Sequence, residues 1–258
     1  MTQVATPLAA LDGKPLGVYS LRLADARPGS KSGWRSFRLL LASSDATFSA
    51  PLIDGVFSTG GRGVAPWIEV IEYHPRVKTS QTELDLPAEA LDLDLFGYLS
   101  GLIPSGGHLM LACESPEHEA TYRLLMRRVP PVLTPLGRLL FDCGFHSVRF
   151  FYLAEGGWEG PQKLWAEKAL DPETARRGDE TTARDVLRFL AEPTNARLAP
   201  ECTGSAVHIL RQTKAPGTLG ELVESLLQEC SAHAAHDPRA FFACAERLLA
   251  GSPLDSTP

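Results

Sequence analysis

The stretch PWIEVIEYHP, residues 66–75, decides the expected fold, because it reads as a central β-strand that ends in polar side chains. Within it, Ile68 and Val70 alternate with Trp67 and Glu69, and a period of two is typical of a strand. What precedes and follows this strand determines whether the sheet around it is parallel or antiparallel.

Three further strands are expected before it, each separated from the next by polar or glycine-rich residues. They are GVYSLRL (17–23), SFRLLLAS (36–43) and PLIDGVFS (51–58). No helical pattern lies between them, so the first third of the chain is predicted to be an antiparallel meander and not a series of strand–helix–strand units.

The pattern changes near residue 88, where leucines recur at helical spacing up to Ile103. A buried strand is expected at HLMLAC (108–113), and Ser115-Pro116 and Thr134-Pro135 both read as a helix cap followed by a first helical proline. Gly144 is a natural helix stop. Two more strands should follow, SVRFFYLA (147–154) and QKLWAEKA (162–169).

Beyond this α/β domain, assigned to residues 14–170, the sequence predicts a linker at 171–181 and a helical extension at 182–251. A capping box at Thr218 and Glu221 and a start at Asp237-Pro238 favour helices there. Their apolar stripes could pack on the domain, on each other or on a second chain. Residues 1–13 and 252–258 are expected to be disordered. The fold class is therefore α/β (α+β), with a mixed, largely antiparallel sheet flanked by helices.

Composition limits the function classes. The net charge of -6 argues against a nucleic-acid partner, and no apolar run reaches the roughly 20 residues that span a bilayer. The five cysteines form no C-x-x-C pair, so they are expected to be buried free thiols, with no metal site. Together with residues 1–13, which lack the features of a signal peptide, they favour a cytoplasmic location.

The densest unusual stretch is YLAEGGWEGPQKLWAEK, residues 152–168. Its glycines permit sharp turns and close backbone approach, so an aromatic ring, carboxylates and an amine could shape a ligand pocket there. The alternative is an ordinary hairpin with exposed charges. The candidate ligand-binding residues are Glu155, Trp158, Glu159, Gln162 and Lys163.

A second candidate lies at the end of the central strand. If Ile68 and Val70 face the core, alternation places Glu72 and His74 on the same side, where they could act as general base and proton relay. Solvation of both side chains as the strand emerges is the competing interpretation. Residues 114–118, which end in His118, also place polar groups after a strand, where α/β proteins often bind ligands; a capped helix start explains them equally well.

Two fold families resemble parts of the chain. LFGYLSGLIPSGGHLML is similar to a helix–strand step of methyltransferases that use S-adenosylmethionine, although residues 14–74 offer no glycine-rich loop after a parallel strand. The order of all the expected elements resembles instead the Gcn5-related N-acetyltransferase fold. In that resemblance, PWIEVIEYHP is the fourth strand, HLMLAC is the fifth and splays from it, and TPLGRLLFDCGF precedes the sixth.

The acetyltransferase resemblance implies an acyl-CoA cofactor and an amine substrate. It further implies that Glu72 or His74 removes the amine proton and that Tyr152 protonates the leaving thiolate. The family's pyrophosphate loop, Q/R-x-x-G-x-G/A, corresponds to RVKTSQTELDLPAEAL (76–91), which contains no glycine. PPVLTPLGRLLFDCGF and EGGWEGPQKLWAEK also resemble a prokaryotic domain-of-unknown-function family near the acetyltransferase fold.

The sequence thus predicts a divergent acetyltransferase-like protein that binds a small-molecule ligand, with acetyl-CoA or another acyl-CoA as cofactor. The second hypothesis is a non-catalytic scaffold whose C-terminal helices dock a protein partner or form a homodimer. An S-adenosylmethionine-dependent methyltransferase is the third.

Overall fold

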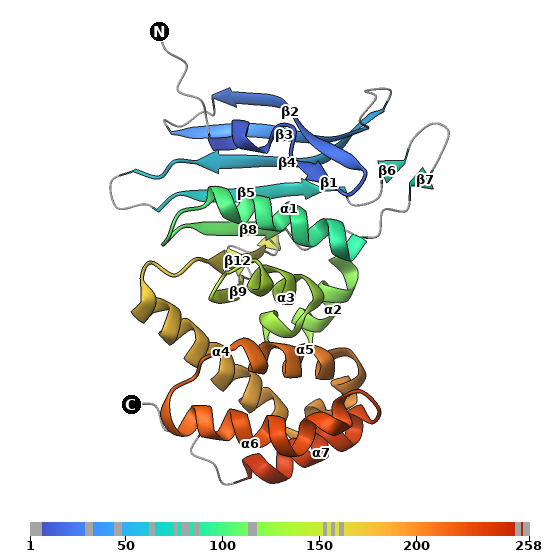
Figure 1. The fold of residues 1–258 in the computed structure, drawn as a ribbon, viewed down its shortest axis with the longest axis vertical. Coiled ribbons are helices and arrows are strands. Elements are labelled where there is room, and N and C mark those ends of the chain that lie inside the picture. Colours follow the sequence, from blue (N-terminus) through green and yellow to red (C-terminus); the bar gives the residue numbers. More distant parts are fainter. Residues whose placement is uncertain are drawn as a thin grey trace.

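A computed structural model describes residues 7–28, 33–43, 48–61, 65–74, 77–78, 83–84, 88–112, 118–151, 154–155, 158–159, 163–250 and 254. Figure 1 shows strands stacked from β2 down to β9, with the C-terminal helices beyond β9. The described strands form one eight-stranded sheet in the order β1-β2-β3-β4-β5-β8-β12-β9, and two short hairpin pairs, β6–β7 and β10–β11.

The predicted meander is confirmed, since β1 to β5 pair antiparallel, each with its neighbour. These strands are β1 Pro15–Leu16, β2 Tyr19–Pro28, β3 Trp34–Ser43, β4 Ser49–Ser58 and β5 Trp67–Tyr73. The short pairs join β6 Val77–Lys78 to β7 Glu83–Leu84, and β10 Ala154–Glu155 to β11 Trp158–Glu159.

The central strands are the exception to antiparallel pairing. β5 runs parallel to β8 (His108–Ala112), and β8 then pairs antiparallel with β12 (Lys163–Glu167), which lies between β8 and β9 (Ser147–Phe151). The parallel register covers Trp67 to Val70 on β5. Since β5 continues to Tyr73, the two strands lose their pairing toward their carboxyl ends. One parallel pair in an otherwise antiparallel sheet does not match the methyltransferase expectation.

Helices cover one face of this sheet. α1 (Ala88–Leu102) connects the parallel strands and crosses in front of them, and α2 (Glu119–Met126) and α3 (Pro135–Asp142) follow β8 (Figure 1). Phe96, Leu99 and Leu140 pack with the inward-facing residues of the strands in one core. Lys168 also donates to the carbonyls of Ser100 and Ile103, which ties β12 to the end of α1. The predicted mixed, largely antiparallel α/β architecture is confirmed.

The prediction that Glu72 and His74 point to the core is wrong, because β5 contains a bulge. On β4, Asp54 opposes Glu72 but its neighbour Gly55 opposes Val70, so Ile71 has no partner. An extra residue inverts the alternation after it. Tyr73 therefore enters the helix-covered core, and Glu72 becomes exposed on the opposite face.

The predicted linker at 171–181 is helical instead. α4 spans Pro172–Ala191, capped by Asp171, whose carboxylate accepts from the backbone N–H of Thr174 at 2.7 Å. Gly178 allows the first half of this helix to approach the backbone of His146 so closely that a Cβ would be 2.7 Å from its carbonyl oxygen. The helical part is therefore continuous with the sheet part.

The remaining C-terminal helices pack on α4 around a second core. They are α5 Ala199–Gln212, α6 Gly217–Ala234 and α7 Pro238–Leu249, with the 3-10 helix η4 Pro193–Leu198 before α5. Their apolar stripes face one another in this core. α2, α3 and the 3-10 helix η3 (Pro131–Leu133) contribute Leu124, Val132 and Phe141 to the same core.

Both expected disordered ends differ from the structure where it describes them. A 3-10 helix, η1 (Pro7–Leu11), buries Leu8 and Leu11 in the sheet core, because this short apolar segment, PLAAL, packs against the strands. Leu254, within the predicted tail, is also buried, against the helical core. Residues 1–6 lie outside the described part of the chain.

Two local predictions also fail. α6 begins at Gly217 after Pro216, without a side-chain cap, so Thr218 lies inside the helix and forms no capping box. Cys230 and Cys244, on adjacent faces of α6 and α7, form a disulfide instead of remaining free. Cys143 and Cys202 are free, and burial raises the pKa of the Cys202 thiol to about 12.

Candidate functional site

The predicted ligand-binding hairpin is described only in part. Glu155 and Trp158 lie opposite each other in the β10–β11 pair, which also includes Glu159, but their side chains lie outside the described part of the structure. Tyr152 and Gln162 lie outside it altogether. Lys163, the first residue of β12, is the one member of this set whose surroundings are defined.

Lys163 forms an ion pair with Glu69 on β5. The pair spans β8, the strand between them, and lies on the face of the sheet opposite the helices. The side chains are only 23% and 17% exposed, so each charge depends on the other for solvation. Both residues lie in stretches that the sequence singles out, but they are distant in the chain, so the sequence does not indicate that they pair.

The other predicted catalytic pair, Glu72 and His74, lies on this same face at the end of β5. The two side chains are 3.5 Å apart, and Asp54 completes a set whose ligand atoms lie within 4.8 Å of one another. Arg38 binds both oxygens of Asp54, at 2.7 and 2.9 Å. A cation would have to displace this bidentate guanidinium, so the geometry favours an ion-pair cluster over a metal site.

On the helix side, the end of β5 presents a different group of side chains. The Tyr73 hydroxyl donates to Asp92 of α1, and the Tyr73 ring is stacked on the imidazole of His118, with centroids 5.8 Å apart and planes 20° apart. Burial and the neighbouring Asp92 charge raise the pKa of Tyr73, so its hydroxyl keeps its proton and acts as a hydrogen-bond donor.

A cavity of about 370 Å³ opens beside Asp92 and His118. This volume is within the range of small-molecule sites. Its walls come from α1, α2, α3 and α5, so segments far apart in the sequence meet there. The other lining residues include Leu93, Thr121, Leu136, Arg138, Asp142, Glu201 and Ser205.

The charged groups of this cavity are already engaged with one another. Asp142 accepts from His208 at 2.7 Å and from Gln212 at 3.2 Å, and Arg123 donates to Glu201 at 2.7 Å. These bonds join α2 and α3 to α5. They fix the wall of the cavity and leave the end near Tyr73, Asp92 and His118 as the chemically distinct part.

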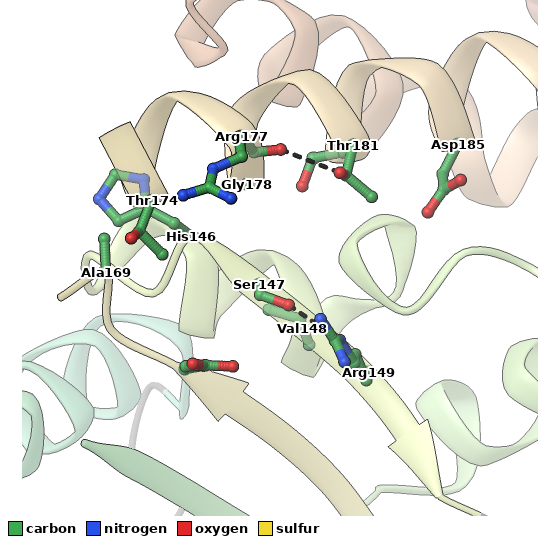
Figure 2. A pocket seen from close by; sticks show the side chains of 12 residues that line it. His146, Ser147, Val148, Arg149, Ala169, Thr174, Arg177, Gly178, Thr181 and Asp185 are labelled. Atoms are coloured by element: carbon green, nitrogen blue, oxygen red, sulfur yellow. Dashed lines mark hydrogen bonds between the residues drawn. The ribbon is translucent and has the colours of Figure 1, made fainter. Parts of the chain in front are cut away.

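A second, more polar groove of about 290 Å³ lies between β9 and α4. Figure 2 shows Arg177, Thr181 and Asp185 along the helix and Ser147 and Arg149 along the strand. The Arg149 side chain donates to Ser147, and Thr181 donates to the carbonyl of Arg177. At one end, His146 meets Asp179, which also accepts from the backbone N–H of Lys214. This groove therefore lies where α4 packs beside the edge of the sheet.

His108 provides a pH prediction. Burial lowers its pKa, with a smaller opposing effect from Glu167, and its Nδ1 is buried without a hydrogen-bond partner among the described residues. His108 therefore binds a proton less readily in the native chain than in the unfolded chain. The pKa of His108 in the unfolded chain is about 6.5, so the free energy of unfolding should fall as the pH drops below that value.

The measurement is the melting temperature of wild type and of His108→Gln, each at neutral pH and below pH 6. We expect wild type to lose more stability on acidification than the variant. His236→Gln, which changes an exposed histidine in the turn before α7, is the control. Equal losses in wild type and His108→Gln would contradict the assignment.

Comparison with known proteins gives a family and a fold. A family model described as "Protein of unknown function (DUF1122)" matches residues 17–193. A crystal structure of a protein of unknown function, AQ1966 from Aquifex aeolicus VF5, is similar with a TM-score of 0.58 and 24% identity, over 75% of this chain and 95% of that one. No curated protein matches. Among the described helices, none is long and apolar enough to cross a membrane.

Proposed function

We propose that this chain, which belongs to the DUF1122 family of proteins of unknown function, binds a small acyl thioester beside the end of β5 and transfers the acyl group to an amine. One observation carries the proposal. The single parallel pair of the sheet, β5 and β8, loses its pairing after Val70 and Leu111, and the 370 Å³ cavity adjoins the end of β5 through Tyr73.

The strand order supports this reading. The resemblance to the Gcn5-related N-acetyltransferase fold equates β5 and β8 with that fold's fourth and fifth strands, which splay to admit the acyl donor. Backbone N–H groups beyond a point where two strands separate are free to hydrogen-bond a ligand, and here they would hold the oxyanion of the tetrahedral intermediate.

His118 is the side chain best placed to act as the general base. It lines the cavity, and stacking on Tyr73 fixes its ring while Asp92 holds Tyr73 in turn. In the reaction, the amine nitrogen attacks the thioester carbonyl carbon, a C–N bond forms and the C–S bond breaks. The amine proton passes to His118, and the sulfur leaves as a thiolate that takes this proton from the His118 imidazolium.

Thiol release tests the proposal. The purified protein should release free thiol from an acyl thioester in the presence of an amine panel. Because residues 76–91 contain no glycine to grip a pyrophosphate, we expect acetyl-CoA and the short acetyl thioester of N-acetylcysteamine to bind within about tenfold of each other.

His118→Ala should reduce kcat by roughly a hundredfold or more with little change in KM. Glu72→Gln is the comparison variant, because Glu72 lies on the opposite face, and it should retain activity. If Glu72→Gln loses activity and His118→Ala retains it, the general base lies at the exposed end of β5 and is not His118. Absence of both thiol release and a heat of binding, with either thioester, would reject the proposal.

The second candidate is a non-catalytic interaction protein. The structure gives it a different surface from the one the sequence suggested. The apolar stripes of the C-terminal helices pack in the second core, where Phe241 and Leu226 are fully buried. An interaction role is favoured by the sheet face opposite the helices, and the side chains on that face indicate which partner would bind there.

A further inference from the structure

The face of the sheet opposite α1 is aromatic where an uncovered sheet face is ordinarily polar. Alternation along β5, β8, β12 and β9 turns one side chain in two toward this face. Among the described helices, α4 borders the face at its β9 edge, where Ser147 and Arg149 line the groove. Five aromatic rings follow one another across it: Trp34, Trp67, His108, Trp165 and Phe151.

The rings form two groups in contact, Trp34 with Trp67 and Trp165 with both His108 and Phe151, and the parallel register of β5 and β8 places Trp67 beside His108. The Trp34 and Trp67 centroids are 4.8 Å apart, His108 and Trp165 are 4.6 Å apart, and Phe151 and Trp165 are 5.6 Å apart. Phe151 remains 42% exposed, and Ile71, in the bulge of β5, remains 50% exposed. An apolar surface of this kind is typical of an interaction site.

The two outer strands of this surface carry opposite charges. At one side, β5 contributes Glu69 and Glu72, and the Glu72 side chain is 62% exposed. At the other side, β9 contributes Arg149, which is the cross-strand neighbour of Trp165. Across the strand order β5-β8-β12-β9, acidic side chains therefore lie at one side and Arg149 at the other, with Met110, Trp165 and the Lys163 and Glu167 side chains of β12 between them.

We propose that the occupant of this face is a second copy of the chain. A two-fold axis parallel to the strands and between β8 and β12 reverses the strand order, so that β9 of each copy lies over β5 of the other. Arg149 then meets the Glu69–Glu72 end of its partner, and the two Trp165 side chains meet near the axis. The interface is self-complementary, as a two-fold dimer requires, and two sheets packed face to face lie about 10 Å apart.

This dimer differs from the one the sequence suggested, since it uses the sheet and not the C-terminal helices. It is also independent of the proposed acyl transfer. The cavity beside His118 lies on the helix side of the sheet, so it stays open in the dimer.

Light scattering after size exclusion, on the full chain over a range of concentrations, tests the proposal. Wild type should be a dimer that dissociates on dilution. Trp165→Glu should be a monomer with an unchanged far-ultraviolet circular dichroism spectrum. If Trp165→Glu fails to fold, Phe151→Glu, which changes a more exposed side chain, should be the monomer instead. A wild-type monomer at every concentration, or a dimer that survives both substitutions, overturns the proposal.

A charge exchange tests the axis itself. Arg149→Glu and Glu72→Arg should each weaken the dimer about tenfold or more, because each places like charges opposite one another. The double variant should recover most of the wild-type affinity. Two weakened single variants with no recovery in the double variant would reject this arrangement of the two copies.

Discussion

Replacing Phe241 by alanine should lower the free energy of unfolding by about 3–5 kcal/mol, which corresponds to a fall of roughly 10 °C in melting temperature for a chain of this size. Phe241 of α7 is completely buried, and its ring contacts that of Phe242 edge to face at 6.0 Å. α7 lies against the other C-terminal helices, so the cavity left by this substitution would open the centre of the second core.

The same variant reveals whether the two cores unfold together. All four tryptophans lie at or before Trp165, whereas helices dominate after residue 171, so tryptophan fluorescence follows the sheet and circular dichroism follows mainly the helices. α2 and α3 contribute to both cores: Leu125 and Leu140 face the sheet, and Leu124 and Phe141 face the helices. We therefore expect both signals to shift by the same amount.

The control for Phe241→Ala is Val18→Ala, which shortens a side chain that is 81% exposed and should change stability by less than about 0.5 kcal/mol. In Phe241→Ala, the midpoint temperature of the fluorescence transition could stay at the wild-type value while that of the circular dichroism transition falls. This result would contradict the shared-core explanation. It would show instead that the chain contains two independently stable units.

The order of the strands β2 to β5 could be predicted because short-range signals determine it. Apolar alternation identified β2 to β5, and the absence of a helical pattern between them left antiparallel neighbours as the simple connection. Two of the cap-and-proline pairs were equally reliable: Thr134 accepts from the N–H of Gly137, and Asp237 accepts from that of Ala240, as the sequence suggested. The third pair, Ser115-Pro116, lies outside the described residues, and α2 begins at Glu119 after His118. These signals act within a few residues of one another.

The face occupied by Glu72 could not be predicted, because it depends on the register between β4 and β5. Alternation along β5 is regular in the sequence, and only the pairing of Asp54 and Gly55 shows that Ile71 is an extra residue. The same bulge brought Tyr73 to His118 and Asp92. Glu72 and His74 therefore lie at the end of β5 on the face opposite the cavity.

The linker prediction failed for a different reason. The first half of α4 buries Gly178 and Asp179 against His146, so it packs through a small residue and a hydrogen bond and lacks an apolar stripe. Asp171-Pro172 repeated the cap-and-proline start that identified two other helices, and it was the signal that could have revealed this one. α5 was not recognised individually, although it supplies one wall of the cavity.

Replacing Gly137 by alanine should destabilise the fold by about 3 kcal/mol, although alanine ordinarily favours a helix. Gly137 is buried in the first turn of α3, where an added Cβ would lie far inside van der Waals contact of the Pro131 carbonyl oxygen. That carbonyl belongs to the backbone and also accepts from the Thr134 hydroxyl at 2.6 Å, so it cannot move alone. The start of α3 would have to shift.

Because Leu136, Arg138 and Leu139 of α3 line the cavity, this shift should also reduce thioester binding at temperatures where the variant remains folded. Gly204→Ala is the matched control. Gly204 is exposed on α5 with no atom within 4 Å of an added Cβ, and the same substitution there should stabilise the chain by up to about 1 kcal/mol. Calorimetric melting and thioester titration of both variants check the prediction. A Gly137→Ala protein that melts at the wild-type temperature would show that the η3–α3 turn relaxes freely, and that its close packing does not hold the cavity wall in place.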